Sequence, residues 1–160
     1  MAERQNKSLQ TSFPEEFDTA FYDKDKIEKI VTNILSNAFK YTPENGSVVV
    51  SVDFYDEFLR IEVSDSGKGI SKEDLKRIFE RFYRADLSRN SQGSGLGLSI
   101  VKQLVELHGG AVGADYRDNR LGIWFQLPKE NLNFSILAIS MAPKRVAWVL
   151  AYGCTLCCDL

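Results

Sequence analysis

The sequence has few cysteines, few prolines and a single histidine among its 160 residues. Its three cysteines, Cys154, Cys157 and Cys158, fall in the last seven residues, and a chain otherwise free of thiols suits a reducing cytoplasm. Because structural zinc takes four well-placed ligands, this cluster and one histidine make a poor zinc site. No charged start followed by an apolar stretch marks a signal peptide. These absences predict a cytoplasmic protein without structural zinc.

The chain also lacks a long hydrophobic run and a large net charge. Residues 134–142 and 146–158 are apolar, but each is shorter than the roughly 20 residues of a membrane-spanning helix. A formal net charge of −2 gives no electrostatic reason to expect nucleic-acid binding. With 44% hydrophobic and 26% charged residues, the composition is that of a soluble globular protein. We expect one domain over residues 1–128 and an atypical apolar tail over 129–160.

Apolar spacing predicts two longer helices. The first is capped by Asp23 and runs to about Phe39, with a buried stripe at i, i+3 and i+4 spacing. The second runs from Leu96 to Leu107 and ends before a pair of glycines. A capping-box signal at Ser71 predicts a short third helix between them.

Alternating apolar residues predict strands between and around these helices. They are expected near Leu9–Phe13, Thr19–Tyr22, Val48–Phe54, Leu59–Val63 and in a final hairpin that includes Ile123, Phe125 and Leu127. Residues 83–95 are polar and contain glycine, which indicates a loop. The order predicts an α+β fold, a two-layer sandwich with helices packed on one face of a mixed, mainly antiparallel sheet.

The segment NILSNAFKYTP, which starts at Asn33, places polar groups on one helical face. Asn33, Asn37 and Lys40 are spaced i, i+4 and i+7, beside the apolar stripe. An asparagine carbonyl suits Mg²⁺, and the lysine ammonium suits a phosphate. The alternative is an ordinary solvated helix flank, although asparagine is a mediocre helix former.

The segment DSGKGI places a carboxylate at the end of a predicted strand. Asp65 can accept a hydrogen bond from the exocyclic amine of adenine, whereas guanine presents a carbonyl there and would be repelled. Gly67 and Gly69 let the backbone come close to a base. The alternative is a plain Asp-Gly turn, which the motif taken alone favours.

The segment GSGLGL lies where the polar loop becomes the second helix. Gly93, Gly95 and Gly97 suit a hinged lid, and free N–H groups at a helix start attract phosphate. Neither a GxGxxG nor a GxxxxGK[ST] pattern is present, so the two commonest phosphate loops are excluded. A glycine-rich linker is the alternative.

Between these segments lie aromatic and basic residues. Phe79, Phe82 and Tyr83 have the spacing of an aromatic patch on a short helix, a pattern typical of core packing. Arg84 and Arg89 follow in the polar loop and could reach a γ-phosphate.

Together these segments resemble the ATP-binding catalytic domain of bacterial sensor histidine kinases, of the Bergerat-fold superfamily shared with gyrase-type ATPases. The similarity covers about residues 7–128. NILSNAFKYTP looks like the N box, DSGKGI the G1 box, IFERFYRAD the F box and GSGLGLSIVKQLVELHGG the G2 region.

The resemblance implies a function and a role for each matching residue. The domain would bind ATP and Mg²⁺, with Asn37 as the metal ligand and Asn37 and Arg84 as catalytic groups. The residues implied to bind the nucleotide are Asn33, Asn37, Lys40, Tyr41, Asp65, Gly67, Gly69, Ile70, Phe82, Arg84, Gly93, Ser94, Gly95, Leu96, Gly97 and Leu98.

The acceptor half of the kinase reaction is missing from the sequence. Complete kinases carry a helical hairpin with a phosphoacceptor histidine, whereas His108 follows the second helix and is expected to be structural. We expect the γ-phosphate to be transferred to a histidine on a dimerisation domain outside this chain and then to a response regulator. Any attachment to a membrane is expected only through an upstream sensor region that this sequence lacks. The atypical ends indicate a gene fragment or a frameshift. Two alternatives are a stand-alone serine kinase of the anti-sigma type and a nucleotide-dependent regulatory module without turnover.

Overall fold

The computed structural model describes residues 6–15, 20–85, 94–129 and 138–139 as a five-stranded sheet covered by helices. The sheet order is β1-β3-β4-β6-β5, with β1 parallel to β3 and every other pair antiparallel. Its strands are β1 (Ser8–Ser12), β3 (Ser47–Phe54), β4 (Phe58–Asp65), β5 (Ala111–Arg117) and β6 (Arg120–Pro128). The helices are α1 (Lys24–Tyr41), α2 (Lys72–Leu75) and α3 (Gly97–Leu107). A separate antiparallel pair joins β2 (Ala20–Phe21) to β7 (Ala138–Ile139).

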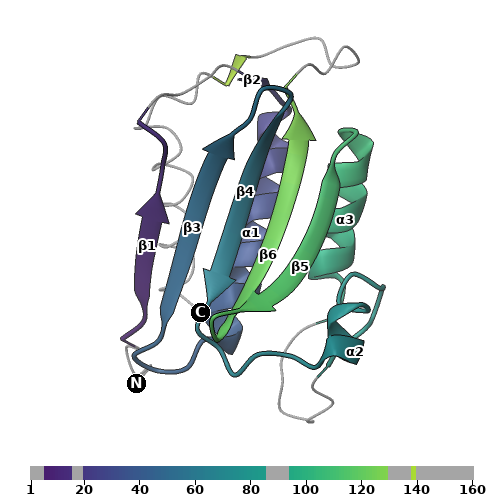
Figure 1. The fold of residues 1–160 in the computed structure, drawn as a ribbon. Helices are drawn as coiled ribbons and strands as arrows, with labels where there is room; N and C mark the ends of the chain where they lie inside the picture. Colours follow the sequence, from purple (N-terminus) through teal and green to yellow (C-terminus); the bar gives the residue numbers. More distant parts are fainter. Residues whose placement is uncertain (1–5, 16–19, 86–93, 130–137, 140–160) are drawn as a thin grey trace.

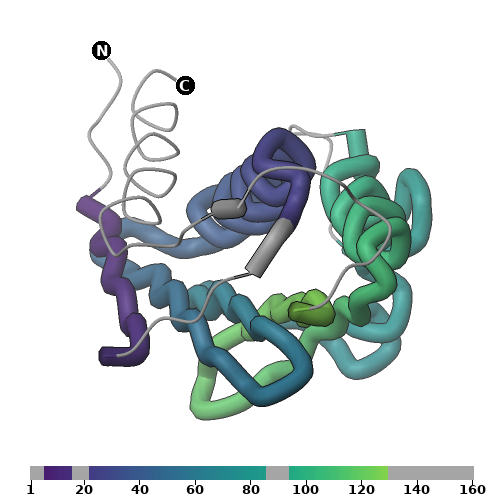
Figure 2. Tube along the Cα trace, turned by 90° about the horizontal axis from the view of Figure 1, so that it is seen from above, coloured from purple at the N-terminus to yellow at the C-terminus, as the bar shows by residue number. Residues whose placement is uncertain are grey.

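The two long helices lie side by side on one face of the sheet. Figure 1 shows α1 and α3 behind the strands, and Figure 2, turned by 90°, shows them as one layer over the sheet. The predicted two-layer α+β sandwich is confirmed. In the described residues, no helix is long and apolar enough to span a bilayer.

Helix α1 follows the predicted pattern and runs two residues beyond Phe39. The Asp23 carboxylate caps its start by accepting from the backbone N–H of Asp25 at 3.1 Å. At its end the Thr42 hydroxyl donates to the carbonyl of Ala38 at 2.7 Å, and Pro43 follows. Because Thr42 donates to the carbonyl of Ala38 in the last turn, the helix continues through Tyr41.

One core holds the layers together, and it follows the predicted periodicities. Inward residues of β3, β4 and β6 alternate with outward ones and pack against the apolar stripes of α1 and α3. The fully buried members include Ile30, Ile34, Val48, Val50, Leu59, Val63, Val101, Val105, Phe125 and Leu127. This core sets where the strands end, and the polar segments lie at those ends.

The short helix differs from the sequence prediction. The capping box is confirmed, since the Ser71 hydroxyl accepts from the N–H of Asp74 at 3.0 Å. The expected aromatic patch on a helix is wrong, because α2 ends at Leu75 and Phe79, Phe82 and Tyr83 lie in turns and the loop beyond it. Backbone bonds of i to i+3 type, such as Arg77 N–H to Asp74, replace the helical pattern there.

Candidate functional site

A cavity of about 580 Å³ lies where α1, the end of β4, the α2 region and the start of α3 meet. Thirteen of the predicted site residues line it: Asn33, Asn37, Lys40, Tyr41, Asp65, Gly67, Gly69, Ile70, Arg84, Ser94, Gly95, Gly97 and Leu98. Phe82 and Leu96 do not line it, and Gly93 and Arg89 lie outside the described residues. The fold therefore brings parts of all three glycine- and asparagine-bearing segments into one cavity.

The polar face of α1 forms one wall and meets the start of α3. The Asn33 side-chain N–H donates to the carbonyl of Lys29 at 2.7 Å, which fixes its amide along the helix. A Cβ added at Gly97 would lie 3.1 Å from the Asn33 Oδ1 and 3.8 Å from the Asn37 Nδ2. Gly97 thus lets α3 begin directly against the two asparagines.

Asp65 ends β4 and is almost fully buried, with 3% of its surface exposed. Its Oδ1 accepts from the N–H of Gly67 at 2.8 Å, which forms the turn after the strand. A Cβ at Gly67 would lie 2.5 Å from that oxygen and 2.8 Å from the carbonyl of Tyr41, so this approach requires glycine. Burial raises the pKa of Asp65, and the Gly67 hydrogen bond and the charge of Arg120 oppose the rise.

The start of α3 is suited to an anionic group. Leu96 at its N-cap has no capping side chain, and its first turn contains no acidic residue. The Ser94 hydroxyl accepts only a long hydrogen bond, of 3.4 Å, from the N–H of Leu96. The N–H groups of a helix start carry partial positive charge and bind phosphate when no side chain occupies them. Lys40 and Arg84 line the same cavity and add full positive charges.

Phe82 and Gly95 are joined where the predicted polar loop leaves and re-enters the fold. The Phe82 N–H donates to the Gly95 carbonyl at 3.0 Å, and both residues have positive φ, 62° and 71°. Phe82 is 71% exposed and does not line the cavity, so it contributes a backbone hydrogen bond to the base of the loop rather than a side chain to the cavity. Sequence motifs cannot show this, since they do not give side-chain direction.

Gly95→Ala is expected to weaken nucleotide binding about tenfold while leaving the core intact. An added Cβ would lie 2.9–3.1 Å from the backbone of Phe82, and the positive φ of Gly95 would itself be strained. Affinity is measured by calorimetric titration with ATP. Gly109→Ala is the control, because Gly109 also has positive φ but its Cβ would meet only Pro128 at 3.8 Å. Equal loss of affinity in both variants would show that the backbone contact between Phe82 and Gly95 has no specific role in binding.

A hydrogen-bonded cluster that the sequence prediction missed lines the cavity beside Arg84. The Tyr83 hydroxyl donates to the Asp74 carboxylate, and the Ser71 hydroxyl donates to its other oxygen at 2.8 Å. These bonds lower the pKa of Asp74 and raise that of Tyr83. Arg77 lies over the Tyr83 ring, 4.3 Å from its centroid. The capping-box motif was the one signal that pointed to this region.

His108 lies away from the cavity, at the end of α3. It is 1% exposed, and its ring Nδ1 lies 2.7 Å from the carbonyl of Leu104, so Nδ1–H is the donor. A ring buried in this way fits the structural role that the sequence predicted.

Comparison with known proteins identifies the family. Residues 22–131 match the model of the "histidine kinase-, DNA gyrase B-, and HSP90-like ATPase" domain, and the chain belongs to that family. Within it, the chain is an ATP-binding catalytic domain of the sensor histidine kinase type.

The relatives support this assignment at the level of the domain. The chain is 46% identical over 111 residues to the sensor histidine kinase WalK of Bacillus subtilis, covering 66% of this chain and 18% of WalK. It is 39% identical over 125 residues to the histidine-protein kinase BaeS of Escherichia coli, covering 76% of this chain and 27% of BaeS. The structure of the mycobacterial sensor histidine kinase MprB matches with a TM-score of 0.71 and 32% identity, covering 81% of this chain and 88% of the other. The chain thus spans under a third of the length of these two curated relatives.

Proposed function

We propose that this domain binds ATP with Mg²⁺ and donates the γ-phosphate to a histidine on a separate dimerisation segment. The observation that carries the proposal is the convergence, in one cavity, of a buried strand-end carboxylate, an asparagine-bearing helix face and an uncapped helix start. Each element is suited to one part of Mg·ATP, namely the base, the metal and the phosphates. Similarity to ShkA, whose full-length structure is in complex with AMPPNP, supports nucleotide binding in this cavity.

We assign the residues roles that follow their places in the cavity. Asp65 accepts a hydrogen bond from the exocyclic amine of adenine, and Gly67, Gly69 and Ile70 line the pocket for the base around it. Lys40, Tyr41 and Arg84 contact phosphates, and Gly95 and Gly97 form the lid hinge with Ser94 and Leu98 beside it. Gly93 and Leu96 are assigned to this hinge from the sequence motif alone, since Gly93 lies outside the described residues and Leu96 does not line the cavity.

The donor set fits a magnesium ion that is bound chiefly through the nucleotide. Mg²⁺ takes oxygen ligands and keeps several waters, so one protein ligand beside the phosphates is sufficient. Asn37 offers an amide oxygen on the wall of the cavity, supported by Asn33 one turn earlier. When bound, the ion would neutralise charge on the phosphates, while Lys40 and Arg84 orient them.

We further propose that residues 1–128 form the catalytic domain and that residues 129–160 are an atypical apolar tail, whose strand β7 pairs with β2 of the domain. The family match ends at residue 131, close to this boundary. A response regulator is the proposed downstream partner, supported by similarity to ThkA, which has been solved in complex with the response regulator TrrA.

The test supplies a histidine acceptor in trans. The chain is mixed with a separately expressed helical hairpin that bears a phosphoacceptor histidine, together with γ-labelled ATP and Mg²⁺. We expect acid-labile, base-stable label on the hairpin and none on the chain alone. Acid-stable label on a partner serine would favour a serine kinase instead. ATP binding with no transfer to any hairpin tested would favour a regulatory module, and label on His108 would overturn its structural assignment.

A further inference from the structure

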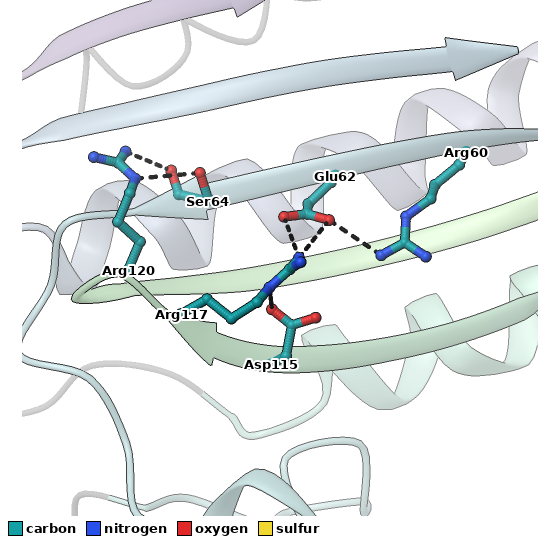
Figure 3. Close-up of polar contacts among 6 residues, drawn as sticks. All are labelled: Arg60, Glu62, Ser64, Asp115, Arg117 and Arg120. Atoms are coloured by element: carbon teal, nitrogen blue, oxygen red, sulfur yellow. Dashed lines mark hydrogen bonds and ion pairs between the residues drawn. The ribbon is translucent and has the colours of Figure 1, made fainter.

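Arg120 joins three strands at the end of the sheet. Its guanidinium donates to the Ser47 hydroxyl and carbonyl, both at 2.9 Å, and to the Ser64 carbonyl at 3.0 Å and hydroxyl at 3.3 Å. Ser47 begins β3, Ser64 is the penultimate residue of β4, and Arg120 begins β6. Figure 3 shows the arginine reaching across to Ser64. One side chain therefore fixes the relative positions of three strand ends.

These three residues immediately precede the buried carboxylate Asp65 and its two cross-strand neighbours, Val48 and Leu121. In the sheet register, Asp65 lies opposite Val48 on β3 and opposite Leu121 on β6. Because side chains alternate along a strand, Arg120 lies on the outer face while its neighbour Leu121 points inward with Asp65. The position of the carboxylate is thus set one peptide away from the Arg120 hydrogen bonds.

The surroundings of Asp65 supply little other support for its charge. Its cross-strand neighbours Val48 and Leu121 are aliphatic, and its one hydrogen bond among the described residues comes from Gly67. Arg120 acts on it from the outer face of the sheet and opposes the effect of burial on its pKa. The charged residues that line its cavity are Lys40, Lys68, Asp74 and Arg84.

Arg120 also differs from the other arginines of this face. Arg117 pairs with Asp115 at 2.9 Å and with Glu62 at 3.3 Å, and Glu62 pairs in turn with Arg60 at 3.1 Å, as Figure 3 shows. Among the described residues, no carboxylate lies within 4 Å of the Arg120 guanidinium, whose partners are hydroxyls and carbonyls. Its positive charge is therefore not neutralised by a neighbouring anion.

We propose that Arg120 is a positioning residue for purine recognition, one that holds Asp65 in register and supplies an unneutralised positive charge behind its carboxylate. This inference rests on the proposed function, in which Asp65 accepts the exocyclic amine of adenine. An ionised carboxylate accepts from that amine and repels the carbonyl that inosine and guanine carry at the same place. A protonated one can donate to that carbonyl, so loss of the positive charge relaxes the choice of base.

The test compares the affinities for ATP and inosine triphosphate by calorimetric titration. Arg120→Gln is expected to weaken ATP binding and to lower the ATP-to-ITP affinity ratio about fivefold, roughly the worth of one hydrogen bond. Arg120→Lys keeps the charge and should retain the ratio within about twofold. Arg117→Gln is the matched control, because it removes an arginine of the same face that is paired with carboxylates. If Arg120→Gln does not fold, Arg120→Met, which keeps an apolar stem, replaces it.

The pH profile separates recognition from a purely structural role. Preference for ATP should be lost as pH falls through the raised pKa of Asp65, and in Arg120→Gln this loss should move to higher pH. Equal weakening of both nucleotides with an unchanged ratio and pH midpoint would overturn the inference, as would a loss of the ratio in Arg120→Lys as large as in Arg120→Gln. If instead Asp65→Asn leaves the ATP-to-ITP affinity ratio of the parent protein unchanged, Asp65 does not recognise adenine, and the proposed function fails rather than the role of Arg120.

Discussion

Replacing Asn37 by alanine is expected to reduce Mg²⁺-dependent phosphoryl transfer by about 10²–10³-fold, the loss seen when one preorganised electrostatic group is removed from an active site. The Asn37 amide is half-buried on α1 and lines the cavity beside the start of α3. Without its oxygen, the metal would lose its proposed protein ligand and the phosphates their alignment. Transfer of label to the histidine-bearing hairpin is the measurement.

The same substitution should leave the fold intact. Alanine has a higher helix propensity than asparagine, so the free energy of unfolding is expected to stay equal or to rise by a few tenths of a kcal/mol. Thr32→Ala is the matched control, because Thr32 is exposed on the same helix and does not line the cavity. Affinity for ATP should fall in the presence of Mg²⁺ and change little in its absence. An equal loss with and without Mg²⁺ would argue against Asn37 as the metal ligand.

Asp65→Asn is expected to separate binding from stability. The asparagine NH₂ would face the adenine amine, and loss of a charge-assisted hydrogen bond costs about 1.5–3 kcal/mol, or roughly 10- to 150-fold in ATP affinity. Stability should rise instead, because burial raises the pKa of the native carboxyl and so penalises its charged form. The amide oxygen can still accept from the N–H of Gly67.

The sign of this stability effect can be checked against pH. Since the folded pKa of Asp65 lies above its unfolded value of 3.8, the parent protein loses stability as pH rises from that value through the folded pKa. Asp65→Asn should therefore be the more stable protein at neutral pH, and the difference should close below the unfolded pKa. Urea unfolding at several pH values measures this, with Asp53→Asn as an exposed control on β3. A variant that is less stable at neutral pH would show that the carboxylate charge supports the fold.

Local patterns were sufficient to predict most of the elements. The i, i+3, i+4 stripe of α1 and the alternation of β3, β4 and β6 report burial on one face, which packing then satisfies. The end of α2 was not predictable in this way, because apolar spacing around Phe79 fits a helix and a series of tight turns equally. The exposure of Phe82 was missed for the same reason, since its ring direction depends on the backbone bond to Gly95.

The sequence by itself determined the order of the three asparagine- and glycine-bearing segments, the helices and strands that carry them, and hence the ATPase family. Only the tertiary structure decided which residues of distant segments support one another. Ser64 and Arg120 are 56 residues apart in the chain and become neighbours through the register of β4 with β6. That register is chosen by the packing of both strands against the helices, and a shift of one residue would turn Asp65 to the outer face. Local chemistry therefore specifies the parts of the site, and cooperative packing specifies how they meet.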